Sequence, residues 1–275
     1  MRVLRNQQKN IILRWLGQAG FAISYQNNYL MIDPYLSDFL AQKYKGQEFP
    51  HTRLMAAPIQ AEKVRNLKYV LCTHGHSDHL DPLTLPVLLN NNPDCKIVAP
   101  AAIRKYVISL NIDESRILSV NANQSVHLVN DISLQTIPSA HEQIRTDDEG
   151  QHYFLGYIIQ IDNIRIYHSG DCVPYVGLEE ELKKRRVDVG LLPVNGRDEF
   201  RRSRGVAGNF TVDEAVKICQ KANIPIMICH HFGMFAFNTV DKNWLTNKAK
   251  AETKEDFRFI VPNEDVAYKV ERLNE

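Results

Sequence analysis

Cys72-Thr73-His74-Gly75-His76-Ser77-Asp78-His79-Leu80-Asp81 is the stretch that decides how the rest of this sequence is interpreted. The apolar run Leu67 to Leu71 before it predicts a short buried strand. Asp81-Pro82 after it predicts the start of a helix, with Asp81 as N-cap and Pro82 at the first helical position. The polar side chains between them therefore lie in a loop at a strand end, where a rigid scaffold can point them into a cleft.

The spacing His74-x-His76-x-Asp78-His79 is typical of a metal site. Two imidazoles separated by one residue can share one ion, and the following Asp-His pair can reach a second ion from the other side of the turn. Mixed imidazole and carboxylate ligands suit zinc, iron and manganese. A solvated polar loop is the weaker interpretation, because such clusters mark metal or catalytic sites. One loop cannot complete a two-metal site, so other segments must supply the remaining ligands.

The composition bounds the class of protein. With 275 residues and 44% hydrophobic residues, the chain can bury a full core, and we expect one domain spanning residues 1–275. Lys and Arg number 33 against 32 Asp and Glu, so no basic field favours nucleic acid as a partner. Five scattered cysteines without a Cys-x-x-Cys pair predict buried thiols in a reducing cytoplasm. We expect a cytoplasmic protein without a membrane partner, since no signal region or ~20-residue apolar run is present.

Further polar residues follow other predicted strands. The strand Ile132 to Pro138 leads to His141, and a hairpin ending at His168 leads to Ser169-Gly170-Asp171, where glycine allows a tight turn. A strand ending at Cys229 delivers His230 and His231. The candidate ligands thus all stand at strand ends. Asp33 also ends a hairpin, and it either supports the metal ligands or simply forms a turn.

Strands alternate with predicted helices over the whole chain, which indicates a layered α/β domain. The predicted helices cover Leu83 to Asn90, Ala101 to Leu110, Leu178 to Arg186 and Thr211 to Ala222, the last opened by the capping box Thr211-Val212-Asp213-Glu214. Lys254 to Val270 is expected to close the fold as a strand or a helix.

Two long loops are expected to hold the substrate. Tyr35 to Gln60 is predicted to be irregular, and its His51 and Arg53 are either substrate contacts or ordinary surface residues. The second loop contains Arg197 at its start and further arginines after it. We predict that Arg197 clamps a phosphate or carboxylate, with a solvated surface loop as the alternative.

The order of these residues resembles the metallo-β-lactamase-like hydrolase superfamily over nearly the whole chain. That resemblance implies a four-layer αββα sandwich. It implies that His74, His76 and His141 hold a first metal ion. It also implies that Asp78, His79 and a C-terminal histidine hold a second, with Asp171 bridging both.

Within that superfamily, three stretches resemble the L-ascorbate-6-phosphate lactonase-like group: Trp15-Leu16-Gly17-Gln18-Ala19-Gly20, Tyr167-His168-Ser169-Gly170-Asp171 and His231-Phe232-Gly233-Met234-Phe235. The last stretch makes His231 the ligand and leaves His230 to contact substrate or to pack. The chain departs from that group in being shorter and in having His141 where the lactonase has an acidic residue.

The resemblance implies a hydrolase in which a hydroxide shared by two divalent ions attacks a small ester or lactone, with Asp78 and Asp171 as catalytic residues. An anionic substrate such as a sugar-phosphate lactone is expected. Manganese suits a lactonase and zinc the wider superfamily, with iron as a third candidate. The alternatives are a phosphodiesterase or nuclease of the same fold, and a metal-dependent binding protein without catalysis. A homo-oligomer remains open.

Overall fold

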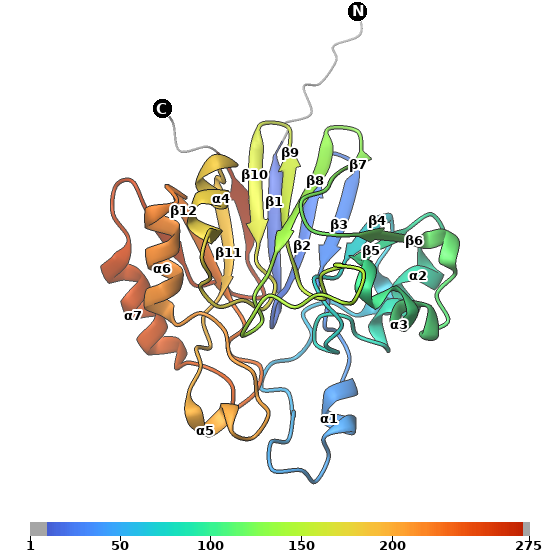
Figure 1. The fold of residues 1–275 in the computed structure, drawn as a ribbon, viewed down its shortest axis with the longest axis horizontal. Coiled ribbons are helices and arrows are strands. Elements are labelled where there is room, and N and C mark those ends of the chain that lie inside the picture. Colours follow the sequence, from blue (N-terminus) through green and yellow to red (C-terminus); the bar gives the residue numbers. More distant parts are fainter. Residues whose placement is uncertain (1–9, 272–275) are drawn as a thin grey trace, which may run out of the picture.

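The computed structural model describes residues 10–271 and places their strands in two seven-stranded sheets that pack face to face (Figure 1). In spatial order, the first sheet consists of β14 (Ala267–Val270), β1 (Ile11–Gly17), β2 (Gly20–Tyr25), β3 (Asn28–Ile32), β4 (Leu67–Leu71), β5 (Lys96–Pro100) and β6 (Ile117–Val120). The second consists of β13 (Arg258–Ile260), β12 (Ile226–His230), β11 (Val189–Pro193), β10 (Ile164–His168), β9 (Leu155–Ile161), β8 (Ile132–Pro138) and β7 (Ser125–Val129).

Helices cover the outer faces of both sheets (Figure 1). On the first sheet these are α2 (Thr84–Asn91) and α3 (Arg104–Ser109), and on the second α4 (Leu178–Lys184), α6 (Val212–Lys221) and α7 (Lys242–Glu252). Two short helices, α1 (Phe39–Lys43) and α5 (Glu199–Arg202), project together from one end of the sandwich. The single-turn 3₁₀ helices are Ala61–Lys63, Ala101–Ile103 and Glu114–Arg116. The predicted four-layer αββα sandwich is therefore confirmed.

The main core lies between the two sheets. Trp15 and Phe21 from the first sheet and Tyr157 and Ile159 from the second belong to one cluster of buried apolar side chains. Each such side chain contributes roughly 1.5–3 kcal/mol by leaving water. A second cluster lies under α2 and α3, and it includes Cys72, which directly precedes the histidine-rich loop. The loop therefore starts from a rigidly packed strand end.

The parallel parts of the sheets gather the functional loops. β3, β4 and β5 run parallel in the first sheet, and β10, β11 and β12 run parallel in the second. The carboxyl ends of parallel strands lie at one edge of a sheet, which is where α/β folds place ligands. Figure 1 shows that α1 and α5 extend from this edge.

Two local expectations differ from the structure, and a third was left open between two alternatives. Pro82 is not the first helical position, because α2 begins only at Thr84. Asp81 still accepts hydrogen bonds at the helix start, from the Leu83 N–H and the Thr84 hydroxyl through its carboxylate and from the Leu85 N–H through its main-chain oxygen. The carboxylate also accepts from the N–H and hydroxyl of Ser37. The predicted irregular loop from Tyr35 contains the short helix α1. Of the two alternatives predicted for the C-terminal region, a strand or a helix, the structure shows strands, β13 and β14.

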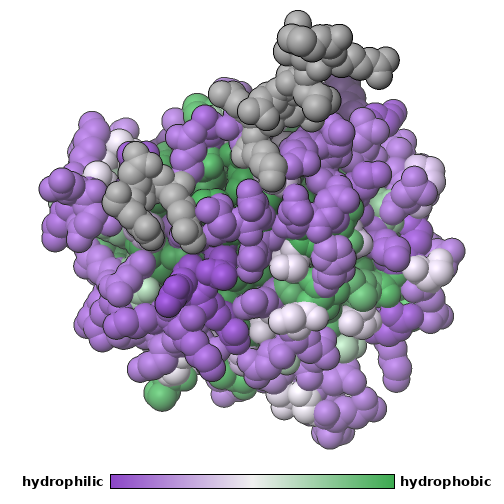
Figure 2. Space-filling model, turned by 90° about the horizontal axis from the view of Figure 1, so that it is seen from above, coloured by the Kyte–Doolittle hydropathy of each residue, from purple (hydrophilic) through white to green (hydrophobic). Residues whose placement is uncertain are grey.

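Figure 2 views the end of the sandwich opposite to α1 and α5. Seen from that end, hydrophilic side chains cover most of the surface, and hydrophobic ones show between them in the middle (Figure 2). No helix within residues 10–271 is long and apolar enough to span a bilayer.

Candidate metal centre

The seven predicted ligands meet at the edge where α1 and α5 project. The histidine-rich loop follows β4, His141 follows β8, Asp171 follows β10 and His231 follows β12. Gly170 is required before Asp171 because its φ is +60° and a Cβ there would lie 2.7 Å from Thr73 Oγ1. The structure therefore brings together side chains that are up to 157 positions apart in sequence (His74 to His231).

The first cluster consists of His74, His76, His141 and Asp171, whose potential ligand atoms lie within 4.8 Å of one another. The ring centroids of His74 and His76 are 4.7 Å apart, and those of His76 and His141 are 4.9 Å apart. The Phe154 ring packs against His74 at 5.2 Å and against His141 at 5.1 Å. This apolar ring holds the imidazoles in place and keeps water from their outer side.

The second cluster consists of Asp78, His79 and His231, and Asp171 also reaches it. Asp171 Oδ1 lies 3.2 Å from His79 Nε2 and 3.3 Å from His231 Nε2. Asp78 Oδ2 lies 3.6 Å from each of the same two nitrogen atoms. Ligand atoms about 2.0–2.1 Å from a tetrahedral ion are separated by roughly 3.4 Å, so these four atoms fit one ion.

Buried polar atoms without a well-formed hydrogen bond also fit metal ions. They are His74 Nε2, His79 Nε2 and Asp171 Oδ1, all of which face the clusters. An unsatisfied buried polar atom is costly, and a metal ion would compensate it. The donor set of imidazoles and carboxylates suits borderline divalent ions such as zinc and manganese. Asp171 would be shared, because it contacts His141 of the first cluster through Oδ2 at 3.8 Å.

Asp33 fixes the orientation of His79. Its carboxylate is fully buried, and Oδ2 accepts a hydrogen bond from His79 Nδ1 at 2.7 Å. The same carboxylate accepts bonds from the Thr73 main-chain N–H at 2.8 Å and from Thr73 Oγ1 at 2.6 Å. In the neutral imidazole, Nδ1 must therefore carry the proton, which leaves the electron pair of Nε2 free to bind a metal ion. Of the two predicted roles, support of a metal ligand is the one that its contacts show, although its φ of 44° also makes a turn.

The three stretches that suggested the lactonase-like group lie against one another. Trp15 stacks on Phe232 with ring centroids 4.7 Å apart. The His231 N–H donates to the main-chain oxygen of Gln18 at 2.8 Å, and His168 Nε2–H donates to that of Ala19 at 2.8 Å. His231 has a φ of 60°, a strained value for a residue with a side chain. The first stretch therefore holds the last ligand in its strained position.

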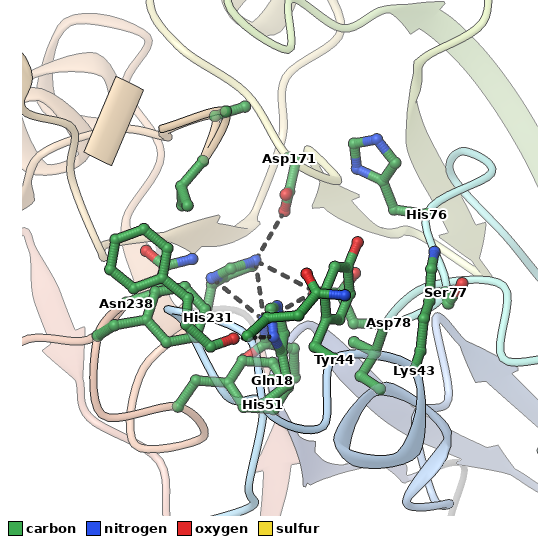
Figure 3. A pocket seen from close by; sticks show the side chains of 18 of the residues that line it. Gln18, Lys43, Tyr44, His51, His76, Ser77, Asp78, Asp171, His231 and Asn238 are labelled. Carbon is green, nitrogen blue, oxygen red and sulfur yellow. Dashed lines mark hydrogen bonds and ion pairs between the residues drawn. The ribbon is translucent and has the colours of Figure 1, made fainter. Parts of the chain in front are cut away.

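Gln18 lies beside the second cluster, although the sequence pattern alone does not indicate this. Its Nε2 lies 2.8 Å from Asp78 Oδ2 and 3.0 Å from His231 Nε2, between two members of the second cluster (Figure 3). The amide therefore borders the position of an ion in that cluster. Its place in a glycine-flanked turn at the end of β1 was the available signal, but a glutamine alone does not indicate a metal site.

Burial lowers the pKa of the cluster histidines, and the neighbouring carboxylates raise it. Burial lowers the pKa of His231, but the Asp171 and Asp78 carboxylates outweigh it and raise the pKa to about 9. Burial likewise opposes the protonation of His79, while Asp171, Asp78 and Asp33 raise its pKa well above the usual range. Burial dominates at His141 and lowers its pKa to about 4. Without metal, His79 and His231 of the second cluster are therefore protonated at neutral pH, whereas His141 of the first cluster is neutral.

This difference predicts that acid removes metal from the second cluster first. A metal ion must displace the proton of His231, whose pKa is about 9, so affinity there should rise about tenfold per pH unit for each proton displaced. The rise should continue from pH 6 to about pH 9 and then level off. Competition with a chelator at pH 6, 7, 8 and 9 measures this. If the affinities of the two clusters for metal changed equally with pH, the prediction would be contradicted.

A cavity of about 680 Å³ opens over the two clusters. Gln18, His76, Asp78, Asp171 and His231 form its floor, and the segments around α1 and after α5 contribute its walls (Figure 3). Both loops that were predicted to hold the substrate therefore border the cavity.

Three residues predicted to bind substrate have other partners and do not line this cavity. Arg197 forms two hydrogen bonds of 2.6 Å with Glu214 and donates to Asn209 O. Arg53 donates to the main-chain oxygens of Tyr35, Ser37 and Met55 and so ties its own loop together. His230 is fully buried and stacks on His168 at 4.7 Å, so it packs behind the site.

Comparison with known proteins identifies related chains. The family model described as the beta-lactamase superfamily domain matches residues 28–232. A UPF0173 metal-dependent hydrolase of Archaeoglobus fulgidus is 26% identical over 244 residues, which cover 87% of this chain and 91% of that protein. An N-acyl-phosphatidylethanolamine-hydrolyzing phospholipase D of Caenorhabditis elegans is 22% identical over 250 residues, covering 86% of this chain and 67% of that protein.

Solved structures share the fold at lower sequence identity. An isothiocyanate hydrolase from Delia radicum gut bacteria superposes with a TM-score of 0.73 at 16% identity, covering 94% of this chain and 98% of that one. The metallo hydrolase Igni18 from Ignicoccus hospitalis superposes with a TM-score of 0.69 at 16% identity, covering 95% and 99%. At these identities, the likeness concerns the fold alone.

Proposed function

The chain belongs to the beta-lactamase superfamily, and on that basis we propose that it is a metal-dependent hydrolase of a small anionic ester or lactone. One observation carries the proposal: ligand-type side chains from four strand ends converge in two clusters that share Asp171. A purely structural metal site would be closed and would need one ion, whereas these clusters form the floor of an open cavity.

The residues of the chain divide the work of the reaction. Divalent ions held by the clusters would acidify a water molecule and polarise the attacked group. Asp78 has a side chain 16% exposed, against 6% or less for Asp171 and His79, so it is the carboxylate best placed to take a proton from the attacking water. The positive charges of His79 and His231 outweigh its burial and hold its pKa well below the usual range, which keeps the carboxylate ionised and free to bind a metal ion but makes it a weak base. Gln18 and Asp33 hold Asp78 and His79 in position.

An anionic substrate group has a better partner in Lys43 than in the predicted Arg197. Lys43 lines the cavity next to Tyr44, and within residues 10–271 no carboxylate forms an ion pair with it. Arg204 also lines the cavity, but its Nε is bonded to Glu48 at 2.8 Å. We therefore assign the anion-binding role to Lys43.

Replacing Lys43 by alanine should raise KM for an anionic ester by about 3–10-fold and leave kcat little changed, since an exposed ion pair contributes about 0.2–1 kcal/mol, and a little more at a partly enclosed site. A neutral ester of the same size should keep its KM. Arg197→Ala is the matched control, because its guanidinium is bound to Glu214, and it should leave both substrates unaffected. Equal increases of KM for the two esters in Lys43→Ala would contradict the assignment.

The lactonase-like group supplies the specific candidate, a sugar-phosphate lactone, with manganese as the expected metal and zinc as the alternative. Support comes from the three motif stretches, which pack together around His231. A phosphodiesterase is the second candidate, because the Caenorhabditis elegans relative is described as a phospholipase D.

A substrate panel separates these candidates. Chelator-stripped protein is reloaded with manganese, zinc or iron and offered a sugar-phosphate lactone, an unsubstituted lactone, a thioester and a phosphodiester. We expect metal-dependent opening of lactones, faster for the phosphorylated one. Turnover of the phosphodiester alone would favour the second candidate. Metal binding without any turnover would favour a binding protein.

A further inference from the structure

One side of the cavity is built from aromatic rings that contact one another. This aromatic wall consists of Tyr44, Phe49, His51, Phe235 and Phe237, all of which line the cavity. Tyr44 and His51 stack at 4.2 Å, and Phe49 and Phe237 stack at 4.9 Å. Flat apolar groups make the largest contact with the faces of such rings, so the wall favours a ligand that carries one.

His51 is the centre of the aromatic wall. Its ring lies 4.9 Å from Phe235 and 4.8 Å from Phe237, in edge-to-face arrangements, in addition to the stack with Tyr44. Rings on three sides leave the imidazole little freedom to rotate. A side chain that is already ordered loses little conformational entropy when a ligand binds.

The tautomer of His51 is fixed by the main chain. Its Nδ1 lies 2.8 Å from the carbonyl oxygen of Phe49, and a carbonyl can only accept, so Nδ1 carries the proton. Nε2 is then a bare acceptor. Burial lowers the pKa of His51 below its usual value, with a smaller contribution from Lys43, and outweighs the Phe49 carbonyl and Asp78, which raise it, so the neutral ring is the main form at pH 7.

His51 also differs from the other cavity histidines in its role. His76, His141 and His231 belong to the two clusters, whereas His51 belongs to neither. Among the described residues, no side chain or main-chain group forms a hydrogen bond with His51 Nε2, and this atom is not sealed within the protein. Its acceptor is therefore available to a ligand in the cavity.

Starting from the proposed hydrolase function, we propose that the aromatic wall is a substrate subsite that takes a flat, largely apolar group bearing one hydrogen-bond donor, which bonds to His51 Nε2. The substrate class is thus an ester or lactone of a hydroxylated ring rather than of an aliphatic chain. The anionic group of such a substrate would lie at Lys43, beside Tyr44 at the edge of the same wall.

Calorimetric titration of the metal-loaded protein with three neutral amides tests the subsite without relying on turnover. The probes are 4-hydroxybenzamide, benzamide and cyclohexanecarboxamide. We expect benzamide to bind more tightly than cyclohexanecarboxamide because it is flat. The hydroxyl should add a further three- to tenfold, the range of one neutral hydrogen bond.

Two substitutions of His51 separate the acceptor from the wall. His51→Phe keeps a flat ring in the wall and removes the acceptor, so the benefit of the hydroxyl should disappear while the preference for a flat ring remains. His51→Asn removes Nε2 but keeps a donor for the Phe49 carbonyl, which guards against misfolding of the loop. His127→Phe is the matched control on an exposed strand position and should bind all probes as the unaltered protein does.

The outcomes separate the subsite from the proposed function. A hydroxyl benefit that survives in both His51 variants, or equal binding of benzamide and cyclohexanecarboxamide, would overturn the subsite even if lactones or esters are hydrolysed. The expected probe preferences together with no hydrolysis on the substrate panel would support the subsite and reject the hydrolase function.

Discussion

Replacing Asp171 by alanine is expected to empty the second metal cluster, weaken the first and lower hydrolysis by about 10³-fold or more. Its two oxygen atoms face different clusters, Oδ1 toward His79 and His231 and Oδ2 toward His141. Within residues 10–271 it is the residue that contacts ligands of both. Metal content per chain and the rate on a lactone, measured on the same preparation, check the prediction.

Asp171→Ala also removes the largest charge that raises the pKa of His231, so protons should compete less with a metal ion for this imidazole. A loss of metal would then come from the missing ligand and not from stronger competition by protons. Asp148→Ala is the matched control, since Asp148 is an exposed aspartate on the loop after His141. It should retain full metal content and activity. An Asp171→Ala protein that keeps two ions and normal turnover would show that Asp171 does not connect the clusters.

Replacing Asp33 by asparagine should weaken metal binding in the second cluster by about 10–100-fold, although Asp33 itself is not a ligand. Asparagine keeps an oxygen for the Thr73 main-chain N–H, but its NH₂ group would face His79 Nδ1, which is itself a donor. His79 would then lose its fixed tautomer and orientation. Titration of chelator-stripped protein with manganese or zinc measures the affinity of each ion.

Asparagine is preferable to alanine here, because removing a buried charged partner costs about 3–5 kcal/mol and could unfold the chain. Asp94→Asn, at an exposed position before β5, controls for the chemical change. Urea unfolding should show both proteins folded under the assay conditions. Unchanged affinity for both ions in Asp33→Asn would mean that Asp33 only shapes the turn.

The positions of the candidate metal-binding side chains could be predicted from the sequence because each follows an apolar strand. Burial of the strands Leu67–Leu71 and Ile226–His230 leaves their carboxyl ends at the edge of the sandwich, where polar side chains become functional. The spacing of the histidine-rich loop then limits the chemistry to metal binding. Local pattern and strand order together therefore determine both fold and centre.

Substrate contacts could not be predicted in the same way, because charge alone does not reveal the partner. Arg197 has Glu214 as its partner, seventeen positions later, at the start of α6. His51 lies in a loop without periodicity, and its place in the cavity depends on Phe235 and Phe237 from the far end of the chain. Only the tertiary structure joins these segments.

Helix α7 was also not predicted. Its residues are mostly polar, and only Leu245 and Ala249, one turn apart, are buried. The Asp241 side chain accepts from the Trp244 N–H and caps the helix, but a single capping aspartate is common in turns as well. Packing against β13 rather than a strong sequence pattern defines this element.

Stepwise metal titration of the chelator-stripped protein, with metal content and lactone hydrolysis recorded at each addition, tests the central claim most directly. We expect two ions per chain, and hydrolysis should appear as the second ion binds, since the histidines of the second cluster are the more strongly protonated and that cluster should fill last at neutral pH. Full hydrolytic activity with one ion per chain, or with none, would contradict the two-cluster centre.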